Sequence, residues 1–251
     1  MNNARARDFF VTGTDTEIGK TFSSSALLQA FAQRGYSAVG MKPIASGAVL
    51  RDGQWHNDDV DSLIAASTVQ ADPMWVCPYL MQTPAAPHIV AKQENVTISL
   101  PHILSGYQQL TTLADTVIVE GVGGFCVPLN DDTDTAQLAQ QLNLPVILVV
   151  GLRLGCINHA LLTAEAIRAR GLHLAAWIAN TVDPHMLYQQ ENIDAIQQRI
   201  GAPLLGHIPR LASVSAHVNS HETHDETNNE TVNTIETMKT AATYLNVDIL
   251  K

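Results

Sequence analysis

A loop between an apolar segment and an apolar helix holds the residues with the clearest chemistry. Residues 9–11 form the apolar segment, Gly13 follows it, and Gly19, Lys20 and Thr21 open the helix. A strand, a loop and a helix start in this order direct several backbone N–H groups at one place, which suits a polyphosphate. The lysine can reach the terminal phosphates, and the threonine hydroxyl can bind Mg²⁺. The loop therefore predicts a nucleoside triphosphate site.

The spacing of the two glycines differs from that of the usual phosphate-binding loop. Five residues, 14–18, separate Gly13 from Gly19, whereas the usual pattern has four. A Gly-Lys-Thr triplet is common by chance and could mark only a strand end before a helix. The strand before it and the helix after it favour the phosphate-binding interpretation.

Two carboxylates and a second lysine are candidates for completing the site. Phosphoryl transfer needs a metal that bridges phosphate oxygens and cations that neutralise charge. Glu120 ends a buried apolar strand before a glycine-rich turn, and Asp59 opens a helix, so both are candidate Mg²⁺ ligands beside Thr21. Lys42 follows another strand. Asp59 could instead be a first-turn helix acid, and Lys42 a solvated strand end, but both are expected to lie near the loop.

Predicted strands and helices alternate along the chain. Strands are expected at 9–11, 37–41, 115–120, 145–150, 172–179 and 204–208, and helices at 22–35, 58–66, 99–113, 136–142, 155–171, 187–200 and 231–245. Segment 145–150 is apolar on both faces, as in central parallel strands. We predict an α/β fold of the P-loop NTPase type, with one doubly wound, mostly parallel sheet and helices on both faces.

The expected position of the site follows from that fold. Ligands of such sheets lie at the carboxyl ends of the strands. The residues at these ends should therefore share one rim: Gly13, Lys42, Glu120, Gly151, Asn180 and Pro209.

Residues 1–251 are predicted to form a single domain with three irregular regions. Segment 48–57 is expected to be a polar loop, and 73–87, with four prolines, an irregular connection. Segment 213–233 is rich in Ser, Thr, Asn and His and is expected to be a solvated or poorly ordered segment. Its histidines 217, 221 and 224 are interpreted as surface residues.

Composition excludes several classes of function. The net charge of −10 argues against non-specific nucleic-acid binding. The three cysteines form no CxxC pair, so we expect neither disulfides nor zinc. No signal-peptide pattern opens the chain, and the longest apolar run, 145–152, is too short to span a bilayer. We therefore expect a soluble cytoplasmic protein without membrane or nucleic-acid partners.

Six segments of the chain closely resemble the dethiobiotin synthetases, which use ATP to close the ureido ring late in biotin synthesis. The matching segments are 11–21, 42–47 (Lys-Pro-Ile-Ala-Ser-Gly), 120–124 (Glu-Gly-Val-Gly-Gly), 145–151, 154–159 (Leu-Gly-Cys-Ile-Asn-His) and 179–180 (Ala-Asn). They occur in the family's order, and the five-residue glycine spacing is the family's own form.

The resemblance implies a reaction. One amine of 7,8-diaminononanoate takes up CO₂ as a carbamate, the carbamate attacks the γ-phosphate of ATP, and the second amine closes the ring and releases phosphate. Lys20 and Lys42 match the two catalytic lysines, which lie between two anions. Thr21, Asp59 and Glu120 match the magnesium ligands, so ATP and Mg²⁺ are the implied cofactors.

The resemblance also implies the ligand contacts. The nucleotide-binding set is Thr14, Asp15, Thr16, Glu17, Ile18, Gly19, Lys20, Thr21, Asp59, Glu120, Gly121, Val122, Gly123, Asn180, Thr181, Pro209, Arg210 and Leu211. The substrate-binding set is Thr16, Ser46, Gly155, Cys156, Ile157 and Asn158. Members of the family are homodimers in which the helix start at 155–158 meets the substrate carboxylate across the interface, as a helix N-terminus can.

Three alternative interpretations remain. A related amide synthase of the cobyrinate type would carry a glutaminase domain, and the residues after Leu211 are too few for one. A partitioning-type ATPase normally has an additional lysine near the first glycine, where this chain has threonines and an aspartate. A regulatory domain that binds nucleotide without turnover would not need the intact set of two lysines, threonine and glutamate.

Overall fold

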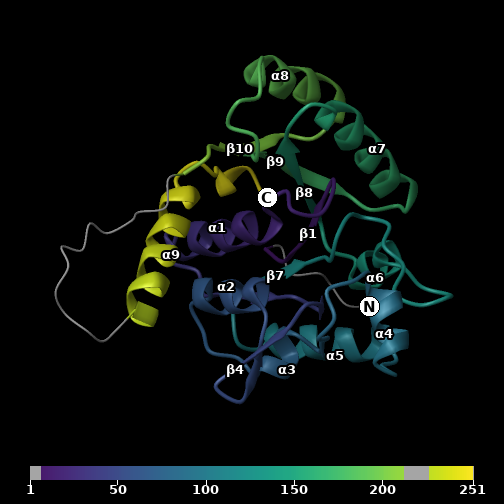
Figure 1. Cartoon of the computed structure of the whole chain (residues 1–251). Coiled ribbons are helices and arrows are strands. Elements are labelled where there is room, and N and C mark those ends of the chain that lie inside the picture. The colour runs from purple at the N-terminus through teal and green to yellow at the C-terminus, as the bar shows by residue number, and fades with distance from the viewer. Residues whose placement is uncertain (1–6, 212–225, 251) are drawn as a thin grey trace.

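A six-stranded parallel sheet runs through the centre of the molecule in the order β10-β9-β8-β1-β7-β2 (Figure 1). This computed structural model describes residues 7–211 and 226–250. The strands are β1 (Phe9–Gly13), β2 (Ala38–Met41), β7 (Thr116–Glu120), β8 (Val146–Leu152), β9 (Leu174–Thr181) and β10 (Leu204–Ile208). Every neighbouring pair is parallel, so the predicted parallel α/β sheet is confirmed.

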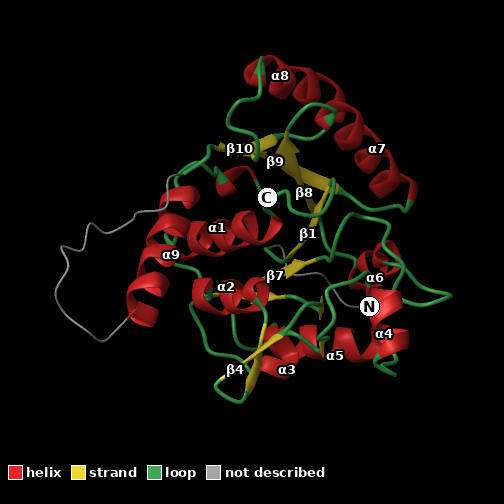
Figure 2. Ribbon diagram, viewed as in Figure 1, coloured by secondary structure: helices red, strands yellow, loops and turns green. Residues whose placement is uncertain are grey.

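Helices cover both faces of the sheet (Figure 2). They are α1 (Lys20–Ala32), α2 (Asp58–Ala66), α3 (Pro73–Val76), α4 (Pro87–Gln93), α5 (Leu100–Leu110), α6 (Thr135–Leu142), α7 (Cys156–Ala169), α8 (Gln189–Ile200), α9 (Glu226–Ala242) and the 3₁₀ turn η1 (Val247–Ile249). Phe9 and Val11 pack in a cluster with α1 and α9, while Phe10 packs in a second cluster with α5 and α6. The two-residue period of a strand explains this division.

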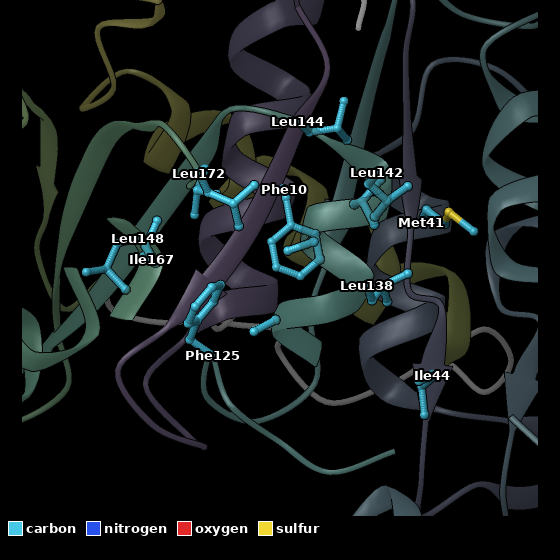
Figure 3. Close-up of a cluster of buried hydrophobic side chains, with 14 of the residues drawn as sticks. Phe10, Met41, Ile44, Phe125, Leu138, Leu142, Leu144, Leu148, Ile167 and Leu172 are labelled. Atoms are coloured by element: carbon cyan, nitrogen blue, oxygen red, sulfur yellow. The ribbon is translucent and has the colours of Figure 1, made fainter. Parts of the chain in front are cut away.

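The cluster around Phe10 fixes the middle of the sheet. Phe10 is 1% exposed, and Figure 3 shows its ring with Leu138 and Leu142 of α6 and with Phe125 around it. Close packing of this kind gives the strands little freedom to shift. This packing therefore holds the strand ends that carry the candidate site residues in fixed positions.

The prediction of a polar loop at 48–57 is wrong, because residues 49–56 form an antiparallel hairpin. Strands β4 (Val49–Arg51) and β5 (Gln54–His56) pair with Leu50 opposite Trp55. Asp52 and Gly53 between them have φ of 49° and 79°. Two residues with positive φ form the turn that suits a two-residue hairpin, and Asp-Gly is one of its preferred sequences.

The expected irregular connection at 73–87 is also partly wrong. It contains the short helix α3 and strand β6 (Tyr79–Leu80), which pairs with β3 (Ile44–Ala45), and α4 begins at its end. Pro73 and Pro87 open the helices α3 and α4. Proline favours the first helical position, where its missing N–H has no intrahelical partner.

The structure describes only the last part of the polar segment expected at 213–233. Residues 212–225, with histidines 217, 221 and 224, lie outside the described residues. The helix expected at 231–245 is present as α9, but it starts earlier, so residues 226–230 are helical rather than part of a solvated or poorly ordered segment. Within the described part of the chain, no helix combines the length and apolar character needed to cross a membrane.

Candidate active site

The phosphate-binding loop is anchored to the ends of β8 and β9. Asn180 Nδ2 donates a hydrogen bond of 2.9 Å to the Ile18 carbonyl. The Ile18 side chain is buried and packs so closely over Gly151 that a Cβ there would lie 2.7 Å from Ile18 Cγ2. Gly19, the residue before α1, has φ 78° and leaves no room for a Cβ beside the Asn180 amide. The loop conformation thus depends on a glycine at both contact points.

Gly19→Ala should weaken ATP binding by at least about 10-fold, which corresponds to about 1.4 kcal/mol. A left-handed backbone strains any residue with a Cβ, and the new methyl would also push the Asn180 amide away from the Ile18 carbonyl. Calorimetric titration with Mg·ATP measures the effect. Gly35→Ala is the matched control, because Gly35 has φ 83° but open space around it. Equal ATP affinities for the two variants would contradict the anchoring role.

Lys20 points back into its own loop. Its side chain is buried, and Nζ donates a hydrogen bond of 2.7 Å to the Asp15 carbonyl. Burial, followed by the nearby charge of Lys42, lowers the pKa of Lys20 to about 8. The Asp15 carboxylate accepts a hydrogen bond from Thr16 N at 2.8 Å and pairs with Arg153. The hydrogen bond from Thr16, together with Arg153, lowers the pKa of Asp15.

Three oxygen-bearing side chains from three elements meet beside the loop. Thr21 Oγ1 lies 2.7 Å from Asp59 Oδ1 and 2.8 Å from Glu120 Oε1. A hydroxyl has one hydrogen, so it cannot donate to both carboxylates at once. Glu120 is fully buried at the end of β7, and its Oε2 has no hydrogen-bond partner. An unpaired buried carboxylate oxygen is costly, which favours a cation at this position.

Lys42 is the counterion of both carboxylates. Its Nζ lies 2.5 Å from Glu120 Oε1 and 3.0 Å from Asp59 Oδ2, and the residue is only 3% exposed. Burial alone would lower the pKa of Lys42, but the charges of Glu120 and Asp59 outweigh it and raise the pKa. Burial likewise acts to raise the pKa of Asp59, and Lys42 and Thr21 outweigh it and lower the pKa. Lys42 is therefore held charged.

Lys20, Thr21, Lys42 and Asp59 line one cleft of about 370 Å³. Glu120 does not line it but lies buried behind it, bonded to Thr21 and Lys42. The walls of the cleft are Thr16, Glu17, Gly19, Lys20, Thr21, Lys42, Ala45, Ser46, Asn57, Asp59, Val122 and Gly123. Both lysines expected to act together lie in it. Sequence reasoning missed Ala45 and Asn57. An asparagine directly before a helix is a recognisable N-cap signal, and it could have drawn attention to Asn57.

The remaining predicted contact residues do not line this cleft. Asn180 and Thr181 end β9, and Pro209, Arg210 and Leu211 follow the neighbouring strand β10, where Ile208 pairs with Asn180. The Thr181 hydroxyl lies 2.9 Å from His207 Nε2. Gly155, with φ 96°, precedes α7, which starts with Cys156, Ile157 and Asn158. Arg153 connects that helix start to the phosphate-binding loop through Asp15.

The donor set fits magnesium. No group of three or more His, Cys, Asp or Glu side chains gathers as a metal site among the described residues. Mg²⁺ needs fewer protein ligands, because it is usually bound by one or two carboxylates together with substrate phosphates and water. Thr21, Asp59 and Glu120 offer hard oxygen donors of this kind.

Comparison with known proteins agrees with this geometry. The parallel sheet, the glycine-flanked loop and the Lys-Thr pair at a helix start define a P-loop nucleoside-triphosphate-binding protein. The model of an AAA domain family matches residues 7–218. A ParA family ATPase from Chlorobium tepidum is similar in structure, with a TM-score of 0.54 and 15% identity over 97% of this chain and 96% of that one. MinD from Aquifex aeolicus has a TM-score of 0.50 at 13% identity, covering 82% of each chain. These likenesses show the fold alone.

A closer relative identifies the family. The ATP-dependent dethiobiotin synthetase BioD of Aromatoleum aromaticum is 56% identical over 206 residues, which are 82% of this chain and 92% of the relative. The chain belongs to the dethiobiotin synthetase family.

Proposed function

We propose that this protein forms dethiobiotin from 7,8-diaminononanoate, CO₂ and ATP in the presence of Mg²⁺. Family membership supports the reaction. The observation that carries the proposal is one cleft lined by Lys20, Lys42, Thr21 and Asp59, with Glu120 buried behind it. Glu120 Oε1 lies 2.8 Å from Thr21 Oγ1 and 2.5 Å from Lys42 Nζ. We also infer that the reaction takes place in the cytoplasm, where ATP is supplied.

The proposed reaction brings two anions together. The carbamate of one amine must approach the γ-phosphate of ATP, and their repulsion has to be offset at the moment of attack. Lys20 and Lys42 are the cations available in the cleft. The carbamate oxygen forms a bond to the γ-phosphorus as the bond to ADP breaks, and the second amine then displaces phosphate to close the ring. The lysines hold and orient both anions.

Thr21, Asp59 and Glu120 would hold Mg²⁺. Bound there, the metal supplies charge neutralisation to the phosphate oxygens. The unpaired Oε2 of Glu120 and the single hydrogen of the Thr21 hydroxyl support this assignment. The ordinary alternative, a purely structural ion pair, would leave Glu120 Oε2 buried without a partner.

A direct assay tests the function. The protein is mixed with Mg·ATP, bicarbonate and 7,8-diaminononanoate, and the products are analysed by mass spectrometry. We expect dethiobiotin, ADP and phosphate in equal amounts. Release of ADP without dethiobiotin would favour a partitioning-type ATPase instead, and no reaction with the diamine would overturn the proposal.

We further infer a homodimer, with the start of α7 contacting the substrate of the partner. Leu154, directly before this start, is 94% exposed, and Leu187 and Tyr188 before α8 are 78% and 72% exposed. Single exposed leucines are ordinary, but α7 packs against α8, so these residues belong to neighbouring elements. An apolar group at this place supports burial against a second copy.

Leu154→Asn should weaken the dimer. The substitution removes one buried leucine from each protomer at about 1.5–3 kcal/mol apiece, so the dissociation constant should rise by at least about 100-fold. Light scattering across a concentration series measures the shift, and Leu113→Asn is the control because Leu113 is exposed after α5, before β7 starts. Identical masses for both variants and wild type would argue against Leu154 at the interface.

A further inference from the structure

Asn57, the residue directly before α2, lines the cleft and has no role in the chemistry described above. We propose that Asn57 is a positioning residue that joins the metal-binding side of the cleft to its substrate side. This inference rests on the proposed function. It is based on the side-chain amide of Asn57, whose oxygen accepts hydrogen bonds from α2 and whose nitrogen donates one to the Ser46 carbonyl.

The acceptor end of the amide belongs to the metal side. Asn57 Oδ1 accepts hydrogen bonds from Asp59 N at 3.1 Å and from Val60 N at 3.3 Å. The Asn57 carbonyl accepts from Asp61 N at 2.9 Å. Asn57 therefore caps α2 and fixes the backbone of Asp59, whose side chain is 48% exposed and is not held by burial.

The donor end belongs to the substrate side. Asn57 Nδ2 donates a hydrogen bond of 3.1 Å to the Ser46 carbonyl. Ser46 follows β3, and its hydroxyl donates to the Ala85 carbonyl at 3.0 Å. Gly47, which comes next, has φ 81°. A side-chain hydrogen bond from Asn57 thus holds the turn after β3.

Only an amide side chain can do both tasks from this position. Serine and aspartate cap helices about as well as asparagine does, and threonine somewhat less well. A carboxylate has no hydrogen to donate, and a hydroxyl has one hydrogen on a shorter side chain. If capping alone were needed, serine or aspartate would serve equally. Asn57→Ser should therefore keep the helix cap and lose the hydrogen bond to the Ser46 carbonyl.

The experiment compares Asn57→Ser, Asn57→Ala and the matched control Asn246→Ala. Asn246 caps η1 through its bond from Asp248 N, and Asp248 pairs with Arg34 beyond the C-terminal end of α1, away from Thr21. Calorimetry measures the dissociation constants of Mg·ATP and of 7,8-diaminononanoate separately, and thermal unfolding measures stability. Binding does not require turnover, so the inference can fail while the wild-type protein still makes dethiobiotin.

For Asn57→Ser we expect diamine affinity about 5-fold weaker, the effect of one neutral hydrogen bond, with Mg·ATP affinity within about 2-fold of wild type. Asn57→Ala should weaken both ligands, and Asn246→Ala neither. Three results would overturn the inference: wild-type affinities in Asn57→Ser, equal loss of both ligands in Asn57→Ser, or the same binding for Asn57→Ala and Asn246→Ala. If Asn57→Ala does not fold, the serine variant still decides.

Discussion

Lys42→Met should lower turnover by about 10²- to 10³-fold, the usual cost of removing one preorganised group that stabilises transition-state charge. Lys42 Nζ contacts both carboxylates and lines the same cleft as Lys20. Methionine keeps most of the side-chain volume and removes the charge. Initial rates of dethiobiotin formation at saturating Mg·ATP and diamine measure the loss. Lys92→Met is the control, since Lys92 is an exposed lysine on α4.

The same substitution should also destabilise the fold, because it leaves Glu120 buried without its counterion. Removing one partner of a buried pair costs about 3–5 kcal/mol. The double variant Lys42→Met with Glu120→Gln removes both charges, so it should regain much of the stability while remaining inactive. Denaturant unfolding measures this difference. Near-normal turnover in a folded Lys42→Met protein would remove Lys42 from the reaction.

Sequence reasoning could place Lys42 and Glu120 on one rim but could not pair them. The rule that parallel strands end at the same edge of a sheet gave the rim. Pairing depends on which strands are neighbours, and β2 lies beside β7 with Met41 opposite Val119. This register sets Lys42 next to Glu120. Apolar periodicity identifies a buried strand, but it carries no information on the neighbour of that strand.

Elements with weak apolar patterns were the ones predicted poorly. Segments such as 145–150 are apolar on both faces and could be read directly. The hairpin at 49–56 is mostly exposed, so its formation depends on Asp52 and Gly53 rather than on burial. The hydrogen bond from Asn57 to Ser46 and the ion pair between Arg153 and Asp15 were also missed. Each depends on a polar contact between segments far apart in the chain, which periodicity does not reveal.

Glu120→Gln should raise the Mg²⁺ concentration needed for half-maximal activity by at least about 10-fold, since even ligand-supporting residues affect metal affinity this strongly. Glutamine has nearly the same shape and can still accept from Thr21 and Lys42, whose contacts with Glu120 Oε1 are 2.8 Å and 2.5 Å. Its nitrogen would take the position of the unpaired Oε2. The fold should therefore persist while one negative charge at the metal site is lost.

The measurement is the initial rate as a function of free Mg²⁺ at fixed ATP, together with the dissociation constant of the diamine. The diamine constant should change much less than the Mg²⁺ requirement, because the hydrogen bonds of Glu120 go to Thr21 and Lys42 and not to Ser46 or Asn57. Glu191→Gln, an exposed acid in the first turn of α8, controls for the loss of one charge from the molecule. A Mg²⁺ requirement equal to that of Glu191→Gln would mean that Glu120 is the buried counterion of Lys42 and no more, and the metal assignment would then rest on Thr21 and Asp59 alone.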